Sequence, residues 1–257
     1  MKDSEISALD LLLKSNEFLH HLDLDRKTAD LVFDRRTIKA VYELMKQQKI
    51  DYLDFPISTG KESVVFKVYV RGKPAVLKIY KMSTLRFSNI WKYIEGDYRF
   101  SKQRIDRSTF VYLWARKEFV NLQICRRIRV PSPNPIAFHK NLLLMSYIGT
   151  KASPAPSLRD SKRTEPELLE KILASVTQLY RKGKLVHADL SEYNILLHRN
   201  IPYLIDMAQS VAIDHPASLY FLRRDIETIC RYFQKGGVEV NPHEIMKGII
   251  NDNDVFI

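Results

Sequence analysis

Three polar residues in the last third of the chain have the types and the spacing needed for joint acid–base and metal chemistry. Asp189 and Asn194 are five positions apart, and Asp206 follows twelve positions later, directly after the apolar run Ile201–Ile205. A positioned carboxylate can accept a proton from a hydroxyl group. A second carboxylate and an amide oxygen are ligands that hard cations such as Mg²⁺ prefer. The pattern therefore predicts a proton acceptor beside a divalent-metal site.

The segment from His187 to Asn194 has the spacing of the catalytic loop of protein kinases, in which an Asp and a metal-binding Asn stand the same distance apart. Asp206 then takes the place of the Asp that makes the second metal contact in those enzymes. A loop alone could arise by chance, whereas a loop followed by an Asp at this interval is a specific signal. We interpret His187 as a residue that packs and hydrogen-bonds the loop rather than one that transfers protons.

From about residue 50 to its end the chain resembles the RIO family of atypical serine/threonine protein kinases. The loop sequence Asp-Leu-Ser-Glu-Tyr-Asn resembles the loop of the type-one subfamily. The chain has no long charged tails, and in this it resembles the archaeal members of that subfamily. The further motifs that carry the resemblance are Ser58–Ser63, Val76–Tyr80, Gly96–Phe100, Trp114–Phe119, Ile205–Ser210, Asp214–Pro216 and Phe221–Asp225.

The resemblance implies an α+β, two-lobed protein-kinase-like fold, with a β-rich N-lobe and a mainly helical C-lobe. We expect an N-terminal helical extension at 1–50, the N-lobe at 51–145 and the C-lobe at 146–257. Met207-Ala208 replaces the Phe-Gly of kinases, and no Ala-Pro-Glu segment follows. Only about 50 residues remain after Asp206. The C-lobe is therefore expected to lack the usual activation loop and peptide-docking helices.

Hydrophobic periodicity predicts the main elements within this frame. A possible capping box, Thr164 with Glu167, marks the start of one helix in the second half of the chain. Helices are expected within 1–50 and over about 109–127, 166–180 and 217–233, and strands over 64–70, 75–80 and 142–145.

Lys78 and Glu118 form a candidate ion pair. Lys78 lies in an apolar strand, where a lysine by itself is ordinarily a solvated residue. Glu118 shares a stripe with apolar residues on the predicted helix 109–127, and burying a carboxylate without a partner is costly. Lys78 is the natural partner, and the pair matches the Lys–Glu pair that aligns ATP phosphates in kinases. The resemblance implies that role here.

Two further segments are candidates for contacts with ATP. A turn ahead of the strand at Val64 offers backbone N–H groups and hydroxyls to phosphate oxygens, although an ordinary β-turn is the simpler interpretation of one glycine. The residues of this turn are Ser58, Thr59, Gly60, Lys61, Glu62 and Ser63. A hinge is expected from Met145 to Gly149. The resemblance implies adenine contacts there from Met145 and from the backbones of Ser146 and Ile148.

The resemblance also assigns roles to the loop residues. Asp189 would be the general base or would orient the attacking oxygen. Asn194 and Asp206 would bind Mg²⁺ or Mn²⁺ between the β- and γ-phosphates of ATP. In this family ATP hydrolysis, with Asp206 transiently phosphorylated, is expected to act as a switch for binding and release.

The net charge of +11 over 257 residues favours an anionic partner such as nucleic acid. The resemblance implies the small ribosomal subunit precursor, with its rRNA and its ribosomal or assembly proteins. No apolar run is long enough to span a bilayer, and two cysteines make no disulfide framework, so we expect a cytoplasmic protein with no membrane partner. The oligomeric state is not indicated. Basic residues cluster at Arg99, Lys102, Arg104 and Arg107; at Arg126, Arg127 and Arg129; and at Arg181, Lys182 and Lys184.

Two other functions use some of the same features. A small-molecule phosphotransferase of the aminoglycoside or choline kinase kind also has an Asp–Asn loop and a later Asp. The short segment after Asp206 leaves little room for its acceptor pocket. A non-catalytic scaffold for pre-ribosomal RNA would use only the basic surface. Kinase-like proteins that have lost catalysis usually lack the phosphate-binding Lys, the base Asp or the metal-binding Asp. This chain keeps all three, as Lys78, Asp189 and Asp206.

Overall fold

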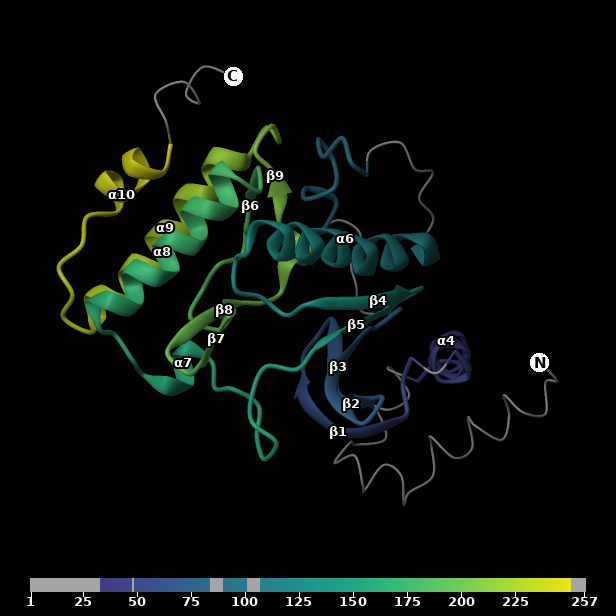
Figure 1. Cartoon of the computed structure of the whole chain (residues 1–257). Coiled ribbons are helices and arrows are strands. Elements are labelled where there is room, and N and C mark those ends of the chain that lie inside the picture. The colour runs from purple at the N-terminus through teal and green to yellow at the C-terminus, as the bar shows by residue number, and fades with distance from the viewer. Residues whose placement is uncertain (1–32, 48, 84–89, 101–106, 251–257) are drawn as a thin grey trace. The chain divides into compact units, whose positions relative to one another are not determined.

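The computed structural model of the chain describes residues 33–47, 49–83, 90–100 and 107–250 (Figure 1). It divides into two compact units, which we describe separately. Unit 1 takes in the described residues of Met1–Asn89, Arg104–Phe119 and Pro135–Tyr147, and unit 2 those of Ile90–Gln103, Val120–Asn134 and Ile148–Ile257. The chain passes from unit 1 to unit 2 for the last time after Tyr147.

A five-stranded antiparallel sheet forms the body of unit 1, in the order β1-β2-β3-β5-β4. The predicted strands at 64–70, 75–80 and 142–145 are confirmed as parts of β2, β3 and β5. Each edge strand contains a proline, Pro56 in β1 and Pro135 in β4, which a strand tolerates where no ladder bond needs its nitrogen. The strand bounds are β1 Tyr52–Thr59, β2 Ser63–Val70, β3 Lys73–Tyr80, β4 Pro135–His139 and β5 Leu142–Ser146.

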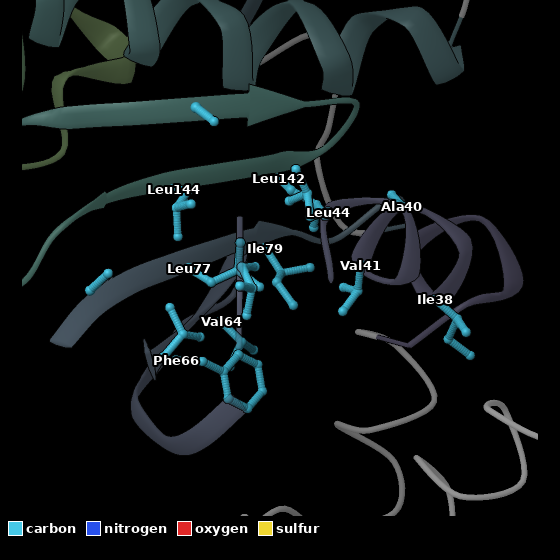
Figure 2. Close-up of a cluster of buried hydrophobic side chains, with 14 of the residues drawn as sticks. Ile38, Ala40, Val41, Leu44, Val64, Phe66, Leu77, Ile79, Leu142 and Leu144 are labelled. Atoms are coloured by element: carbon cyan, nitrogen blue, oxygen red, sulfur yellow. The ribbon is translucent and has the colours of Figure 1, made fainter. Parts of the chain in front are cut away.

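Helix α4, Arg35–Lys46, contributes to the core of unit 1 and confirms a helix within the predicted extension. Residues 1–32 of that extension lie outside the described residues. The helix begins after Asp34, whose side chain accepts a hydrogen bond from the N–H of Thr37 at 2.7 Å. Its apolar face buries Ile38, Val41 and Leu44 in one cluster with side chains from the sheet (Figure 2). This cluster fixes the sheet that carries Lys78.

Helix α6, Arg107–Ile128, confirms the helix predicted at 109–127. Its residues up to Phe119 belong to unit 1, and those from Val120 belong to unit 2. Glu118 is therefore described with the sheet, and Asn121 with the helical unit. No helix in the described part of the chain is both long and apolar enough to cross a membrane.

Unit 2 is mainly helical, with two small two-stranded sheets, β6 with β9 and β7 with β8. Helix α10 packs against α8 and α9 (Figure 1). Only a short 3₁₀ turn, β9 and a brief connection separate Asp206 from α9. The bounds are α7 Leu158–Ser161, α8 Pro166–Arg181, β6 Leu185–Val186, β7 Ile195–His198, β8 Ile201–Leu204, η1 Met207–Gln209, β9 Val211–Ala212, α9 Ser218–Lys235 and α10 Pro242–Ile249.

The helices predicted at 166–180 and 217–233 are confirmed as α8 and α9, but the predicted capping box is wrong. Glu165 is the N-cap residue of α8, and no side-chain bond caps the helix. Pro166 takes the first helical position, where its missing N–H costs nothing. Thr164 instead lies against the backbone of Gly236, where an added Cβ would collide with the Thr164 side chain.

Candidate active site

In unit 1 the structure brings Lys78 and Glu118 together. The Nζ atom of Lys78 lies 3.1 Å from Oε1 and 3.0 Å from Oε2 of Glu118, and the two residues are 5% and 1% exposed. Strand β3 supplies the lysine and helix α6 supplies the glutamate. A carboxylate this deeply buried requires its cation. The pairing that the sequence predicts is therefore present.

Tyr80 is a member of this group that the sequence analysis missed. Its hydroxyl donates a hydrogen bond to Oε2 of Glu118, and Nζ of Lys78 lies 5.0 Å from the centre of its ring. The available signal was the spacing: residues two apart on a strand point to the same face. Glu118 thus accepts from both Lys78 and Tyr80, which fixes its carboxylate in one orientation.

The predicted phosphate loop forms the connection between β1 and β2. The N–H of Gly60 donates to the carbonyl of Ser63 at 2.9 Å, and Ser58, Thr59, Lys61 and Glu62 are exposed. Ser63 begins β2 and is half-buried. The exposed groups at the tip are accessible to a ligand, and the turn itself is an ordinary hairpin connection.

Lys81, directly after β3, supports this tip and was not predicted. Its backbone N–H donates to the carbonyl of Glu62 at 2.9 Å, and its Nζ donates to the carbonyl of Gly60 at 2.7 Å. The residue is 5% exposed. A buried lysine held by backbone carbonyls stiffens the turn, because two points of the loop are tied to the end of β3.

The three predicted hinge residues occupy different environments. Met145 is buried within β5, where it pairs with Val76 of β3, and Ser146 ends that strand opposite Ala75. Both belong to unit 1. Ile148 belongs to unit 2, and its carbonyl accepts a hydrogen bond from the N–H of Ala155 at 3.0 Å.

In unit 2 the loop from His187 to Asn194 places its two chemical residues in direct contact. The side-chain nitrogen of Asn194 donates to the backbone carbonyl of Asp189 at 2.7 Å and to its Oδ2 atom at 3.2 Å. Gln209, for which the sequence indicates no role, donates to the same Oδ2 atom at 3.0 Å. Two amides therefore orient the Asp189 carboxylate, which is the requirement for a positioned base.

The backbone on both sides of Asp189 is held by α9. The buried carboxylate of Asp225 accepts from the N–H of Ala188 at 2.7 Å and from the N–H of Leu190 at 3.0 Å. Arg224 donates to the carbonyl of Ala188. Ala188 has a φ of 64°, a left-handed conformation that is unfavourable for a residue with a Cβ. The bonds from α9 stabilise this strained backbone and so position Asp189.

Burial affects the protonation of Asp225. Its removal from water raises the pKa of the carboxyl from 3.8 to about 7, against the opposing effect of the two backbone N–H donors. The neighbouring Arg224 also favours the charged form. The sequence contained a signal for this residue only as the last position of the Phe221–Asp225 motif, without a role.

Asp206 is placed beside Asn194 by the backbone. The N–H of Ile205 donates to the carbonyl of Asn194 at 3.0 Å, so the residue that precedes Asp206 is bonded to the loop. Asp206 has a φ of 61° and caps the 3₁₀ turn Met207–Gln209. Aspartate tolerates this left-handed conformation better than most residues.

Asn121 of α6 holds the segment after Asp206. Its side-chain nitrogen donates to the carbonyls of Met207 at 2.8 Å and Ser210 at 3.3 Å. Arg99 donates to the Asn121 side-chain oxygen at 2.9 Å and forms a two-point pair with the buried Asp97, with Nη2–Oδ2 at 2.6 Å and Nε–Oδ1 at 2.8 Å. A polar chain thus runs from the Gly96–Phe100 motif to the Asp206 segment.

This network corrects one prediction about charge. Arg99 does not belong to a basic surface cluster, because its guanidinium is engaged with Asp97 and Asn121 and its side chain is only 14% exposed. Lys102, Arg104 and the side chain of Arg107 lie outside the described residues. Arg126, Arg127 and Arg129 are exposed, as are Arg181, Lys182 and Lys184.

The side chain of His187 hydrogen-bonds Ile205, the residue before Asp206, rather than the loop that begins at His187. Its Nε2 atom lies 3.0 Å from the carbonyl of Ile205, so this nitrogen carries the proton and donates. Its Nδ1 atom is buried and has no hydrogen-bond partner among the described residues. Burial lowers the pKa of the ring from 6.5 to about 4. A neutral ring with this tautomer supports Ile205 and, through it, the position of Asp206.

The donor set fits a hard divalent cation. The nitrogen of the Asn194 side chain is turned toward Asp189, so the amide oxygen faces away and suits a cation. Together with the Asp206 carboxylate it offers two oxygen ligands, and Mg²⁺ commonly takes its remaining ligands from phosphate and water. In the described ranges no three His, Cys, Asp or Glu side chains gather as a metal site. The residues present would therefore hold a cation in combination with a phosphate ligand.

Comparison with known proteins identifies the family. The RIO domain family model matches residues 64–245 of the chain. The RIO-type serine/threonine-protein kinase Rio1 of Thermoplasma acidophilum is 48% identical over 186 residues, which cover 72% of this chain and 98% of that protein. Rio1 of Methanocaldococcus jannaschii is 36% identical over 241 residues, covering 93% and 81% of the two chains. The chain belongs to the RIO family, whose members named here are serine/threonine-protein kinases.

A solved structure supports the fold. The crystal structure of the Rio2 kinase–ADP/Mg²⁺–phosphoaspartate complex from Chaetomium thermophilum is similar, with a TM-score of 0.64 at 24% identity. The match covers 84% of this chain and 66% of that one. The predicted α+β kinase-like fold, with a β-sheet N-lobe and a helical C-lobe, is therefore confirmed. Unit 1 carries the sheet of the N-lobe, and unit 2 carries the helices of the C-lobe.

Proposed function

We propose that this protein is an ATP-dependent serine/threonine protein kinase and ATPase, and that it acts on the small ribosomal subunit precursor. The observation that carries the proposal is the Asp189 carboxylate held by the amides of Asn194 and Gln209, in a chain of the RIO family. Phosphoryl transfer requires little covalent chemistry from the protein, and positioning and electrostatics supply most of the catalysis. An oriented base and paired charges are suited to that task.

Each unit contributes a defined set of groups to this chemistry. In unit 1, Lys78 would neutralise phosphate oxygens while Glu118 and Tyr80 keep its side chain in place. The exposed tip at Ser58–Ser63 would contact the phosphates, and Met145 and Ser146 would contact the adenine, as would Ile148 of unit 2. In unit 2, Asp189 would accept the proton of the attacking hydroxyl group or water.

Asn194 and Asp206 would hold Mg²⁺ or Mn²⁺, which neutralises charge on the β- and γ-phosphates. Asp206→Asn keeps the shape of the side chain and removes its charge. We expect calorimetry to show a large loss of affinity for Mg²⁺–ATP and little change for ATP in the presence of a chelator. Unchanged metal-dependent affinity and unchanged turnover would rule out Asp206 as a metal ligand.

Asp206 is also the residue that we propose to be transiently phosphorylated during ATP hydrolysis. The bonds of Asn121 to the turn after Asp206 hold the backbone next to this carboxylate, which supports the proposal. Mass spectrometry of protein quenched during ATP turnover tests this. A phosphate on Asp206 that hydroxylamine removes is expected, and hydroxylamine-resistant phosphate found only on serine would contradict the switch.

The precursor-particle partner is proposed on the charge of +11 and on exposed arginines at the end of α6. Arg126 and Arg127 also favour the helix C-terminus electrostatically, so exposure alone does not assign them a partner. Charge reversal at Arg126, Arg127 and Arg129 should weaken co-sedimentation with small-subunit precursors, steeply with salt. If binding to the particles does not change with salt concentration or with the bound nucleotide, a conventional protein substrate would be favoured.

A cytoplasmic location completes the proposal. Cys125 and Cys230 are both free and buried, and burial raises their thiol pKa values to about 12 and about 11. Free, unreactive thiols suit a reducing compartment. Fractionation of native cells followed by detection of the chain in the ribosome-containing fraction tests both the location and the partner.

A further inference from the structure

A charged pocket of about 600 Å³ lies in unit 2 beside the loop that carries Asp189. Its lining combines residues of α7, of α9 and of the loop itself. Four of the lining residues are basic and two are acidic: Arg159, Lys162, Arg231 and Lys235, with Asp160 and Glu192. The proposed kinase chemistry uses none of them.

The pocket is held in shape by contacts between its walls. The hydroxyl of Tyr232 on α9 donates to the carbonyl of Leu158 on α7 at 2.9 Å. Thr164 touches the backbone of Gly236, where any side chain would collide with it. The N–H of Arg159 donates to the carbonyl of Glu192 at 3.0 Å. The pocket is thus built before any ligand arrives, and it is bonded directly to the Asp189 loop.

The charge of the pocket exceeds what local structure explains. Lys235 in the last turn of α9 and Lys162 at the C-cap of α7 both favour helix C-termini. Arg159 also belongs to the last turn of the four-residue helix α7, so the same reason covers it. Arg231 lies one turn before the end of α9, where this reason is weaker. Within the described part of the chain, none of these four residues forms an ion pair within 4.0 Å. One oxygen of the Asp160 carboxylate already has a partner, since it accepts a hydrogen bond from the Ser157 hydroxyl at 2.7 Å.

An exposed aromatic side chain adjoins one of these cations, Arg159. Tyr193, in the loop, is 60% exposed, and the Arg159 guanidinium lies 5.9 Å from the centre of its ring. An exposed aromatic ring beside several cations is the combination that binds single-stranded nucleic acid, because bases stack on the ring while phosphates pair with the cations. Single-stranded RNA offers unstacked bases for this contact.

We propose that this pocket binds backbone phosphates of single-stranded RNA, with a base stacked on Tyr193. The inference rests on the proposed ribonucleoprotein partner and names the surface that touches its RNA. An acidic acceptor peptide is the competing occupant, because the pocket adjoins the Asp189 loop. A peptide carboxylate would need the cations but would not need an exposed ring, so Tyr193 favours RNA.

The test measures the affinity of the full chain for a short labelled oligouridylate at several salt concentrations. The double variant Arg231→Gln/Lys235→Gln removes two cations that lie on the solvent side of α9. We expect affinity to fall on the order of tenfold and the slope of log K against log salt to fall by about 1.4, from about 0.7 for each lost phosphate contact. Tyr193→Ala should also weaken binding about tenfold, with the salt slope unchanged.

A matched control removes the same charge elsewhere. Arg223→Gln/Lys247→Gln affects exposed residues of α9 and α10 outside the pocket, and it should leave affinity within about twofold of the unaltered chain. The thermal unfolding midpoint of each variant reports whether it folds. Equal losses in the pocket and control variants would overturn the pocket and leave the partner proposal standing.

Two other outcomes separate the remaining possibilities. If the unaltered chain binds no oligouridylate at any salt concentration, the proposal of an RNA partner is wrong. If the pocket variant keeps its RNA affinity but loses phosphorylation of acidic peptides relative to neutral ones, the pocket is a peptide site and the RNA assignment is wrong. Loss of RNA affinity with unchanged peptide preference supports the proposal.

Discussion

Unit 1 and unit 2 hold their candidate functional groups in different ways. In unit 1 a side-chain ion pair, Lys78 with Glu118, is carried by a regular strand and a regular helix. In unit 2 the functional side chains lie on irregular backbone, with left-handed conformations at Ala188 and Asp206. There the supporting bonds go to the backbone, chiefly from Asp225 and Asn121.

This difference follows from what each unit has to position. A lysine that contacts phosphates needs its charged group held in one position, and a buried carboxylate partner holds it there. A base and a metal ligand that must converge from separate turns need a particular backbone path, which regular structure does not provide. Strained backbone persists only where surrounding bonds determine it. The predictions below test whether each unit depends on its own kind of support.

The largest effect is expected at Asp189. Asp189→Asn keeps the size of the side chain but removes its ability to accept a proton, so phosphoryl transfer should fall by about 100-fold or more. Radiolabelled transfer to a generic acceptor or to the protein itself is the measurement. An unchanged unfolding midpoint is the control for folding. Activity near that of the unaltered protein would show that Asp189 is not the base.

The ion pair of unit 1 comes next. Glu118→Gln leaves Lys78 buried beside a neutral amide, and we expect a loss of about 3–5 kcal/mol in the free energy of unfolding. The double variant Lys78→Met/Glu118→Gln should cost less than the sum of the single changes. Denaturant unfolding measures both. Strict additivity would mean that the two residues act independently.

The same sheet offers a control for this prediction. Lys67 and Asp54 form a looser pair with Nζ–Oδ2 at 3.6 Å, and the Asp54 side chain is 27% exposed. Because this carboxylate reaches solvent, Asp54→Asn should cost less than about 1 kcal/mol. A cost equal to that of Glu118→Gln would show that burial does not distinguish the two pairs.

A smaller loss is expected when the backbone support of unit 2 is altered. Asp225→Asn leaves one side-chain oxygen for the N–H groups of Ala188 and Leu190, so one buried donor loses its acceptor. We expect about 1–3 kcal/mol of destabilisation. Turnover should fall through kcat rather than through the KM for ATP, because the change displaces Asp189. A variant with lower stability and unchanged kcat would limit Asp225 to a structural role.

The last effect is a change in the pH dependence of the free energy of unfolding. The lowered pKa of His187 gives stability above pH 6.5 that is lost as the pH falls toward 4. The raised pKa of Asp225 acts in the opposite sense, since its contribution is complete below pH 3.8 and is lost as the pH rises toward 7. The two contributions partly cancel between pH 4 and 6.5.

Asp225→Asn removes the contribution of Asp225 to the pH dependence and leaves that of His187. The variant should therefore lose stability on acidification from pH 6.5 more steeply than the unaltered protein, by up to about 1.4 kcal/mol per pH unit. Denaturant unfolding at a series of pH values measures the slope. Parallel pH profiles for the two proteins would show that Asp225 does not titrate in this range.

Local sequence patterns predicted most of the helices and strands. They also predicted the ion pair that holds Lys78 in unit 1, but not the hydrogen bonds that hold the backbone of unit 2. An alternating run predicted β2, the turn after it predicted β3 as a returning strand, and a short apolar run predicted β5. An apolar stripe interrupted by Glu118 predicted its pairing with Lys78. The edge strands β1 and β4 were missed because Pro56 and Pro135 break their patterns. The capping box at Thr164 was wrong because Pro166 shifts the helix start by one residue.

The sequence by itself determined the family, the order of the elements and the identity of the reactive residues, because spacing along one loop and periodicity along one segment are local properties. Only the tertiary structure showed the residues that support them. Asp225, Asn121, Lys81 and Gln209 act through hydrogen bonds to positions 20 or more residues away along the chain. Such bonds depend on how distant segments pack, and no local pattern records that packing. The same reason explains the pocket beside Tyr193, whose walls come from α7, α9 and the Asp189 loop.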